Sequence, residues 1–139
     1  LHTDSISKLT LFQRNYFLPR TKINQYNFSL NTSNKFEYFV EEQVKHPLFL
    51  RCFGKISNMN RYKNLVVLFD INDTLNNNLM YQAISLTEAC PINENGEILF
   101  DFTIATDHFK TKNTLSVYMY NPRELVVQGE INLAFYKIH

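Results

Sequence analysis

Glycine is scarce in this chain, with three residues in 139. A phosphate-binding loop needs closely spaced glycines, because its backbone must approach the phosphate oxygens, so no loop of that kind is present. The G-x-S-x-G turn that presents a nucleophilic serine is also missing. These absences argue against the nucleotide-binding loops and against this type of serine hydrolase.

Cysteine is equally scarce, and the two residues do not form a recognisable motif. Cys52 and Cys90 lie far apart, at a spacing that matches no zinc or redox site. Cys52 lies in an apolar run, where a buried free thiol is common. Cys90 precedes Pro91 at the end of an expected strand. Two free thiols are the favoured interpretation, and a disulfide between them stays open.

Long apolar runs and clusters of one charge are missing as well. No apolar run reaches the roughly 18 residues that a membrane span needs, and no signal peptide is visible. The formal net charge is +1 and the basic residues do not cluster, so nucleic acid is not an expected partner. Because the chain starts at Leu1 without methionine, we expect a domain cut or processed from a larger protein.

The titratable residues do not suggest a reaction centre. No pair of histidines has H-x-H or H-x-x-x-H spacing. His108 lies beside Asp107, but a catalytic dyad also needs a nucleophile and an orienting group. The carboxylates of Glu41 and Glu42 are expected to point to opposite faces of a strand. We therefore expect no enzymatic activity.

What the chain does contain is apolar and aromatic residues in short alternating runs. Hydrophobic residues make up 45% and charged residues 19%, which is typical of a folded domain rather than a disordered segment. The length favours one domain, residues 1–139, large enough to bury a real core. Residues 1–7 are polar, and we expect them to be a frayed terminus or a linker.

The last quarter of the chain has the clearest strand pattern. Residues 115–120 and 131–136 alternate apolar and less apolar side chains, which predicts strands with one face on a core. A short strand is expected between them at residues 125–128. Residues 97–104 alternate in the same way, which predicts that Ile98, Phe100, Phe102 and Ile104 point inward.

Six further segments are enriched in aromatic or β-branched residues and are predicted to be strands. They are residues 8–18, 26–30, 36–44, 48–56, 64–71 and 81–86. Within 36–44, Phe36, Tyr38 and Val40 are expected on one face, with a helix over 35–45 as the alternative. Residues 48–56 carry apolar groups on both faces, which predicts a central strand, and Gly54 suggests a bulge or bend.

Eight to ten short strands without a convincing helix predict an all-β fold. We expect a two-sheet antiparallel β-sandwich of the jelly-roll type, because a jelly roll brings its first and last strands together and both ends of this chain are apolar. An antiparallel barrel with an internal ligand cavity is the alternative.

Three groups of residues are candidates for binding. Tyr118 and Tyr120 should point away from the core, where tyrosine rings suit sugar stacking, although ordinary cross-strand aromatic pairing also accounts for them. Arg51 lies mid-strand, where it could bind a hydroxyl or carboxylate, or pair with an acidic residue across the sheet. Oxygen donors at Asp70, Asn72 and Asp73 make a weak calcium candidate; a polar connecting loop is the favoured interpretation.

The order of features from Leu48 onward resembles a module of bacterial cell-surface proteins, namely the galactose-binding-like, jelly-roll domains found as carbohydrate-binding modules. The features are the apolar run 64–70, Tyr81, the alternating run 97–104, the aromatic-Asn-Pro turn at 120–122 and the last strand at 130–138. The chain departs from the pattern in two ways. It has no tryptophan, and the usual acidic position at the start of the last strand is present only as Glu130.

The resemblance implies a non-catalytic domain of a larger secreted or surface protein, with an extracellular, cell-surface or periplasmic location. Its implied partner is a glycan, and no cofactor is expected beyond the structural calcium common in the group, which cannot be assigned to residues here. The alternative function is a structural or protein-interaction domain that packs against partner domains or copies of itself.

Overall fold

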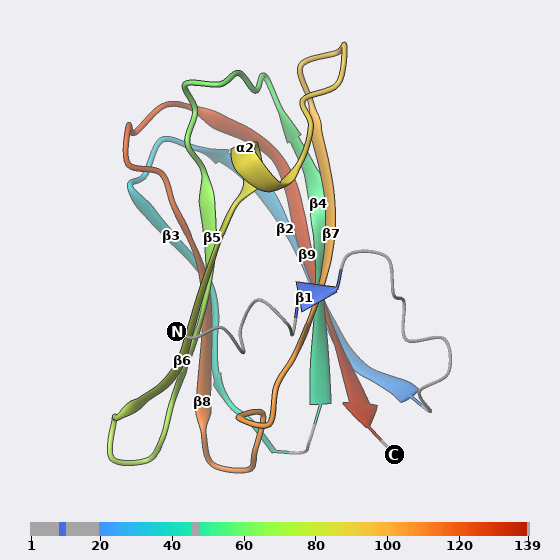
Figure 1. Ribbon diagram of the computed structural model, residues 1–139, viewed down its shortest axis with the longest axis vertical. Coiled ribbons are helices and arrows are strands. Elements are labelled where there is room, and N and C mark those ends of the chain that lie inside the picture. The colour runs from blue at the N-terminus through green and yellow to red at the C-terminus, as the bar shows by residue number, and fades with distance from the viewer. Residues whose placement is uncertain (1–8, 11–19, 46–47, 139) are drawn as a thin grey trace.

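Two antiparallel β-sheets pack face to face (Figure 1) in a computed structural model that describes residues 9–10, 20–45 and 48–138. The five-stranded sheet has the order β1 (Leu9–Thr10), β7 (Ile98–Ala105), β4 (Leu48–Ser57), β9 (Val127–Ile138) and β2 (Arg20–Thr32). The four-stranded sheet has the order β3 (Phe36–Gln43), β8 (Thr114–Tyr120), β5 (Val66–Asn72) and β6 (Asn78–Ser85). The predicted all-β sandwich is confirmed.

The strand pairing is that of a jelly roll. Apart from the short β1, the strands pair antiparallel as β2 with β9, β3 with β8, β4 with β7, and β5 with β6. These four pairs are nested in the sequence, as if one long hairpin had been rolled into two layers. The expectation that the first predicted strand, at 8–18, lies beside the last one was wrong for its described part: β1 pairs with β7, and β2 is the strand that pairs with β9.

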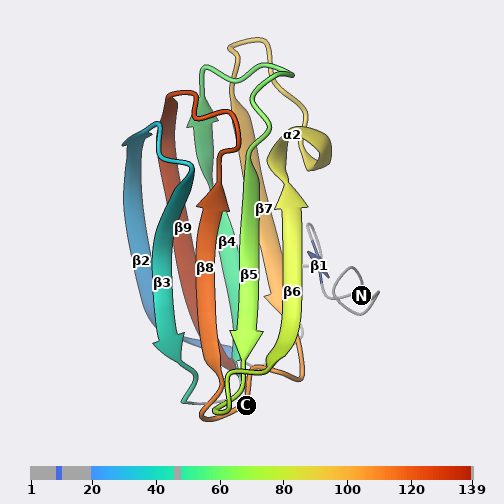
Figure 2. The same cartoon turned by 90° about the vertical axis from the view of Figure 1, so that its left-hand side faces the viewer.

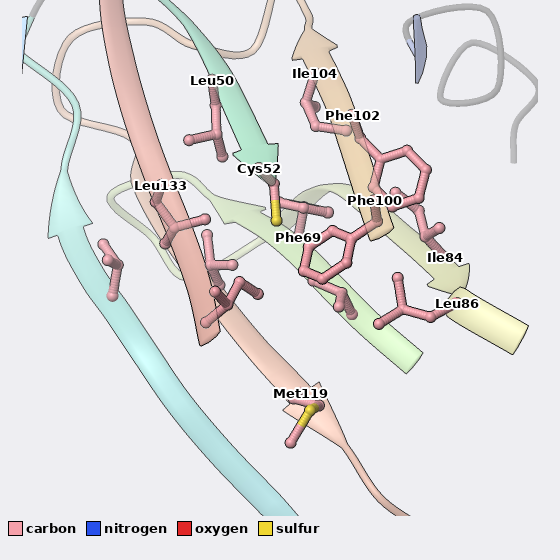
Figure 3. Packing of buried hydrophobic residues seen from close by; sticks show 14 of the residues in the cluster. Leu50, Cys52, Phe69, Ile84, Leu86, Phe100, Phe102, Ile104, Met119 and Leu133 are labelled. Carbon is pink, nitrogen blue, oxygen red and sulfur yellow. The ribbon is translucent and has the colours of Figure 1, made fainter. Parts of the chain in front are cut away.

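The core lies between the two sheets and is almost entirely apolar (Figure 3). The predicted inward positions of β7 are confirmed, since Ile98, Phe100, Phe102 and Ile104 are at most 4% exposed. On β8, the inward positions Leu115, Val117 and Met119 are buried as predicted. Side chains of both sheets meet in this layer, including Leu50, Cys52, Phe69, Ile84 and Leu133.

Strand β4 is central, as predicted, because it lies between β7 and β9. Its Gly54 does not form the expected bulge, since the register with both neighbours is continuous. The glycine instead allows a close strand approach. A Cβ atom at Gly54 would lie 2.2 Å from the carbonyl oxygen of Glu130, and one at Gly129 would lie 2.1 Å from that of Lys55. Side chains at either position would force β4 and β9 apart.

Several predicted boundaries were wrong. No separate strand occupies residues 125–128, because β9 starts at Val127 and runs on through Gly129. The segment predicted at 26–30 belongs to a much longer strand, β2, which also contains Thr32. A single helical turn, α2 (Leu86–Ala89), follows β6, where no helix was expected. Of the strand predicted at 8–18, only residues 9 and 10 lie within the described residues; residues 1–7 lie outside them.

A β-bulge in β3 changes which face its side chains occupy. Tyr38 is opposite Tyr118, but Val40 is opposite Val117, so Phe39 is an extra residue in the strand. Phe36 and Tyr38 therefore point outward while Val40 is buried. The prediction that these three share one face was wrong, because a bulge shifts the two-residue alternation by one. The helical alternative for this segment is excluded.

Both cysteines are free thiols, in agreement with the favoured interpretation. Cys52 is fully buried in the core and Cys90 is partly buried after α2. Burial raises the pKa of both thiols, because it disfavours the thiolate.

Candidate functional site

The outer face of the four-stranded sheet, which faces the viewer in Figure 2, gathers aromatic side chains from three strands. The alternation of β8 turns Tyr118 and Tyr120 outward, as predicted from the sequence. The strand register places Tyr38 and Phe36 opposite them on β3. We call this group, together with Tyr81 on β6, the tyrosine face.

The rings of the tyrosine face stack in cross-strand pairs. Tyr38 and Tyr118 have ring centroids 4.7 Å apart and ring planes inclined by 25°. Phe36 and Tyr120 are 5.0 Å apart with an inclination of 23°. Aromatic pairs at these distances stabilise neighbouring strands. The pairing interpretation of Tyr118 and Tyr120 is thus correct for their packing, and their role in binding stays a prediction.

Exposure differs sharply within these pairs. Tyr38 is 60% exposed, Phe36 is 48% exposed and Tyr81 is 52% exposed, whereas Tyr118 and Tyr120 are only partly exposed. Strand β3 is an edge strand, so no further strand covers one side of the Phe36 and Tyr38 rings. The rings available to an incoming ligand are therefore those of Tyr38, Phe36 and Tyr81, with the less exposed Tyr118 and Tyr120 beside them.

Polar groups border this face near the end of β5 and the start of β8. Asp70 on β5 is opposite Tyr81 on one side and Ser116 on the other, and Glu41 is opposite Ser116. Burial raises the pKa of the Asp70 carboxyl, an effect that a hydrogen bond from the Asn78 side chain partly opposes. The tyrosine face is therefore an aromatic surface with oxygen acceptors beside it.

Burial and these neighbours change the pKa of the Tyr118 phenol. Burial raises its pKa to about 12, and nearby Asp70, Tyr81 and Tyr38 add to the shift because a second negative charge there is unfavourable. The hydroxyl group of Tyr118 is therefore protonated and able to donate a hydrogen bond at any physiological pH. Tyr38, Tyr81, Tyr118 and Asp70 form one cluster of hydroxyl and carboxylate groups.

Arg51 lies on the other sheet, away from the tyrosine face. Its Nε atom donates to Oδ1 of Asp101 and its second terminal nitrogen donates to Oδ2, both at 2.8 Å. The guanidinium group also lies 4.1 Å from the ring centroid of Phe53. The interpretation that Arg51 pairs with an acidic residue across the sheet is confirmed, and the structure does not bring it together with Tyr118 and Tyr120.

The oxygen donors at the β5–β6 connection are already engaged within the protein. Asp73 accepts hydrogen bonds from the backbone N–H groups of Asn77 and Leu75, which lower the pKa of its carboxyl. Asn72 and Asp70 both accept from the Asn78 side chain. These bonds form a connecting turn, and among the described residues no group of three or more His, Cys, Asp or Glu could hold a metal ion.

The remaining acid–base candidates are dispersed. Glu41 is opposite Ser116 on the outer face and Glu42 is opposite Leu115 on the inner face, so their carboxylates do point to opposite faces, as predicted. His108 is partly buried in the β7–β8 connection. His2, His46 and His139 lie outside the described residues.

Sequence reasoning missed Phe36, Tyr38 and Tyr81 as members of the face. The alternation of β8 alone was enough to place Tyr118 and Tyr120, but their neighbours depend on which strands pair with β8 and in which register. Periodicity within one strand carries no information on that pairing. Tyr81 was expected only as the first residue of a strand at 81–86 and as a feature of the family resemblance, whereas it lies within β6.

No family model matches the chain and no curated protein matches it. Among solved structures, it is similar to the infectious bursal disease virus VP2 subviral particle, with a TM-score of 0.49, 10% identity and coverage of 86% of this chain and 33% of that one. The Gx strain of the same virus gives a TM-score of 0.39 at 12% identity, again covering 86% of this chain and 33% of that one.

The chain spans about a third of the length of these virus chains. At such identities and scores the likeness carries no argument about function. The comparisons show neither a bacterial nor a carbohydrate-binding family. The described residues contain no helix long and apolar enough to cross a lipid bilayer.

Proposed function

We propose that this chain is a non-catalytic β-sandwich module of a larger secreted or cell-surface protein, and that its tyrosine face binds a glycan. The observation that supports this most is the aromatic cluster in which Tyr118 stacks on Tyr38 and interacts electrostatically with the carboxylate of Asp70, which is opposite Tyr81. Two of its rings are more than half exposed. The bacterial origin of the parent protein is part of the same proposal and rests on the sequence resemblance.

The chemistry of this cluster suits a sugar. A pyranose has an apolar face of C–H groups that packs on an aromatic ring, and hydroxyl groups at its edge that need hydrogen-bond partners. Tyr38 and Tyr81 offer the rings, while Asp70, Ser116 and the tyrosine hydroxyls offer donors and acceptors. Tryptophan, which often provides such a surface, is replaced here by several tyrosines.

The proposal is tested by screening the isolated domain on a glycan array and measuring the affinity of each hit by calorimetry. Tyr38→Ala and Tyr81→Ala are expected to lower the affinity at least tenfold, about 1.4 kcal/mol. The matched control is Tyr62→Ala, because Tyr62 is 71% exposed but lies in the β4–β5 connection. An array without hits, or equal affinities for all three variants, would refute glycan binding at this face.

A second candidate function is docking against another copy of this chain. Toward the start of β5, away from Asp70, the outer face has eight outward positions without any charged residue. They are Phe36, Tyr38, Val66, Leu68, Ala83, Ser85, Tyr118 and Tyr120. Enrichment in aromatic residues and depletion of charge are typical of the centre of a protein interface. A flat face of this kind can pack on its own symmetry mate.

Sedimentation velocity over a range of concentrations distinguishes this second function from the first. Self-association that Phe36→Asp abolishes would favour it, because the aspartate places a charge within the apolar contact. Leu75→Asp serves as the control, since Leu75 is 81% exposed in the β5–β6 connection. A chain that stays monomeric at high concentration would exclude docking between copies.

A further inference from the structure

The margin of the sandwich between β2 and β3 contains a pocket of about 320 Å³ that is separate from the tyrosine face. Its floor is formed by the buried side chains of Val44, Leu115 and Phe135. Its wall contains Tyr26 from β2 and Glu42 from β3. The volume is at the lower end of the range for small-molecule sites, and such sites combine apolar surface with a few convergent polar groups.

The polar groups point inward where a sandwich would normally have apolar side chains. Tyr26 is opposite Leu133 on β9, and Glu42 is opposite Leu115 on β8, and both of these leucines are fully buried. The next inward position of β2, Asn24, is opposite Phe135. An inward carboxylate is unfavourable to folding unless it is paired or hydrogen-bonded, and the Tyr26 hydroxyl provides one hydrogen bond to Glu42. A cationic ligand would provide the charge partner that Glu42 lacks among the described residues.

Two β-bulges produce this arrangement. The extra residue Phe39 in β3 shifts the alternation, so that Glu42 faces inward and Glu41 outward. In β2 the register shifts between Lys22 and Asn24, next to Ile23, which lines the pocket. Bulges turn side chains toward a chosen face and are over-represented beside binding sites. Both bulges act on the polar side chains that line this pocket.

The hydrogen bonds leave one acceptor of Glu42 for a ligand. The Tyr26 hydroxyl donates to Glu42 Oε2 at 2.9 Å and accepts from the Asn24 side-chain amide at 2.7 Å. Oε1 of Glu42 accepts no hydrogen bond from the described residues. The ring of Tyr26 is in turn held edge-to-face on Phe135, with centroids 5.9 Å apart. The carboxylate is therefore oriented, half-buried and only partly used.

We propose that this pocket binds a small organic ammonium ion, with its hydrocarbon body on Val44, Leu115 and Phe135 and its charged head on Glu42. A charge-assisted hydrogen bond to a carboxylate is about twice as strong as a neutral one. The rings of Tyr26 and Phe135 add a surface that attracts cations. The exposed Lys45 at the rim opposes a cation, but its ammonium group is in contact with solvent and is screened.

Three probes of equal length test the choice of ligand: pentylammonium, pentanol and pentanoate. Each is titrated into the full chain, and binding is followed by the backbone amide signals in two-dimensional NMR. Pentylammonium is expected to shift the signals of Asn24, Glu42 and Val44 in a saturable way, and pentanoate is expected to leave them unchanged. Equal affinity for pentanol and pentylammonium would overturn the proposal.

Two isosteric variants locate the site. Glu42→Gln removes the charge but keeps an acceptor for Tyr26, and it should lower the affinity for pentylammonium at least tenfold. Glu41→Gln is the matched control, because it removes the same charge from the neighbouring residue on the opposite face. The same loss in both variants, or no loss in either, would overturn the proposal.

A third variant keeps the test decisive if Glu42→Gln does not fold, which a thermal melt shows. Lys45→Gln removes the opposing charge at the rim and should raise the affinity for pentylammonium at least twofold. An unchanged or lower affinity would count against a cation site. Loss of glycan binding at the tyrosine face would leave these results unaffected, since neither Glu42 nor Lys45 lies on that face.

Discussion

Arg51 and Asp101 form a two-bond ion pair across strands β4 and β7, with both nitrogen–oxygen distances at 2.8 Å. Their side chains are 35% and 25% exposed, so solvent screens the pair only in part. The pair joins the two strands diagonally, because Arg51 is opposite Thr103 and Asp101 is opposite Phe53. It also explains how a central strand can carry a charged residue among apolar neighbours.

Asp101→Asn is expected to lower the free energy of unfolding by about 1 kcal/mol, because one charge of a bidentate pair is lost in a partly screened position. Urea denaturation at low salt measures the change, and a double-mutant cycle with Arg51→Met isolates the pair. Glu97→Gln should change stability by less than about 0.5 kcal/mol, since its pair with Lys55 is a single, longer contact at 3.5 Å. Equal losses in the two variants would contradict this ranking.

The sandwich could be predicted because its inner positions alternate with little interruption. In β7 the inward run from Ile98 to Ile104 is regular, and the register with β4 has no shift along that length. In β8 the same regularity fixed the outward direction of Tyr118 and Tyr120. In these strands the apolar residues have one face to bury, and the two-residue period is then sufficient.

The features that could not be predicted depend on pairing between distant segments. The bulge at Phe39 is invisible in the sequence, because an extra residue only has meaning relative to the partner strand. The long β2 contains Asn24, Gln25 and Asn27, which do not favour strands by themselves. They are held in a strand because β9 pairs with them residue by residue.

Gly129 provides a sharper test of how closely β4 and β9 approach. Gly129→Ala is expected to destabilise the protein by about 3 kcal/mol or more, because its Cβ atom would overlap the backbone of Lys55 and the residue has a φ of 147°. Thermal unfolding followed by circular dichroism measures the loss.

Gly96→Ala is the control for Gly129→Ala. Gly96 also has a positive φ, 73°, but a Cβ atom there would meet nothing closer than 3.8 Å. Only the backbone strain remains, so the expected loss is about 1 kcal/mol. If the two alanine variants were equally stable, the close approach of β4 and β9 would not be what requires glycine at position 129.

Gln82 is a buried polar residue whose side-chain oxygen has no hydrogen-bond partner in the structure. It lies on the inward side of β6, between Met80 and Ile84, and is 7% exposed. A buried acceptor without a partner costs about 1–3 kcal/mol. Gln82→Met keeps the length of the side chain and is expected to stabilise the protein by about 1 kcal/mol.

Chemical denaturation of Gln82→Met and of the control Gln128→Met checks this expectation. Gln128 is exposed and accepts a hydrogen bond from Asn58, so its replacement should be close to neutral or slightly destabilising. Destabilisation by Gln82→Met would show that the amide of Gln82 has a favourable role in the core.

Asp70 and Asp73 lie close in the sequence but should respond to pH with opposite signs. Burial raises the pKa of Asp70 in the folded state, so the unfolded chain loses this proton first as the pH rises. The protein is therefore destabilised by ionisation of Asp70 as the pH rises from the ordinary carboxyl range, about 4, through the folded-state pKa. Asp70→Asn should stabilise the protein at neutral pH and have little effect below about pH 3.

Asp73 behaves in the reverse way because hydrogen bonds, first of all from the Asn77 backbone, lower its pKa. Its contribution is present at neutral pH and is lost as the pH falls below the ordinary carboxyl value and through the folded-state pKa. Asp73→Asn should therefore be destabilising at neutral pH, with a difference that vanishes in acid. Urea denaturation of both variants and the parent chain across this range measures the two signs, and a shared sign would show that burial does not dominate at Asp70.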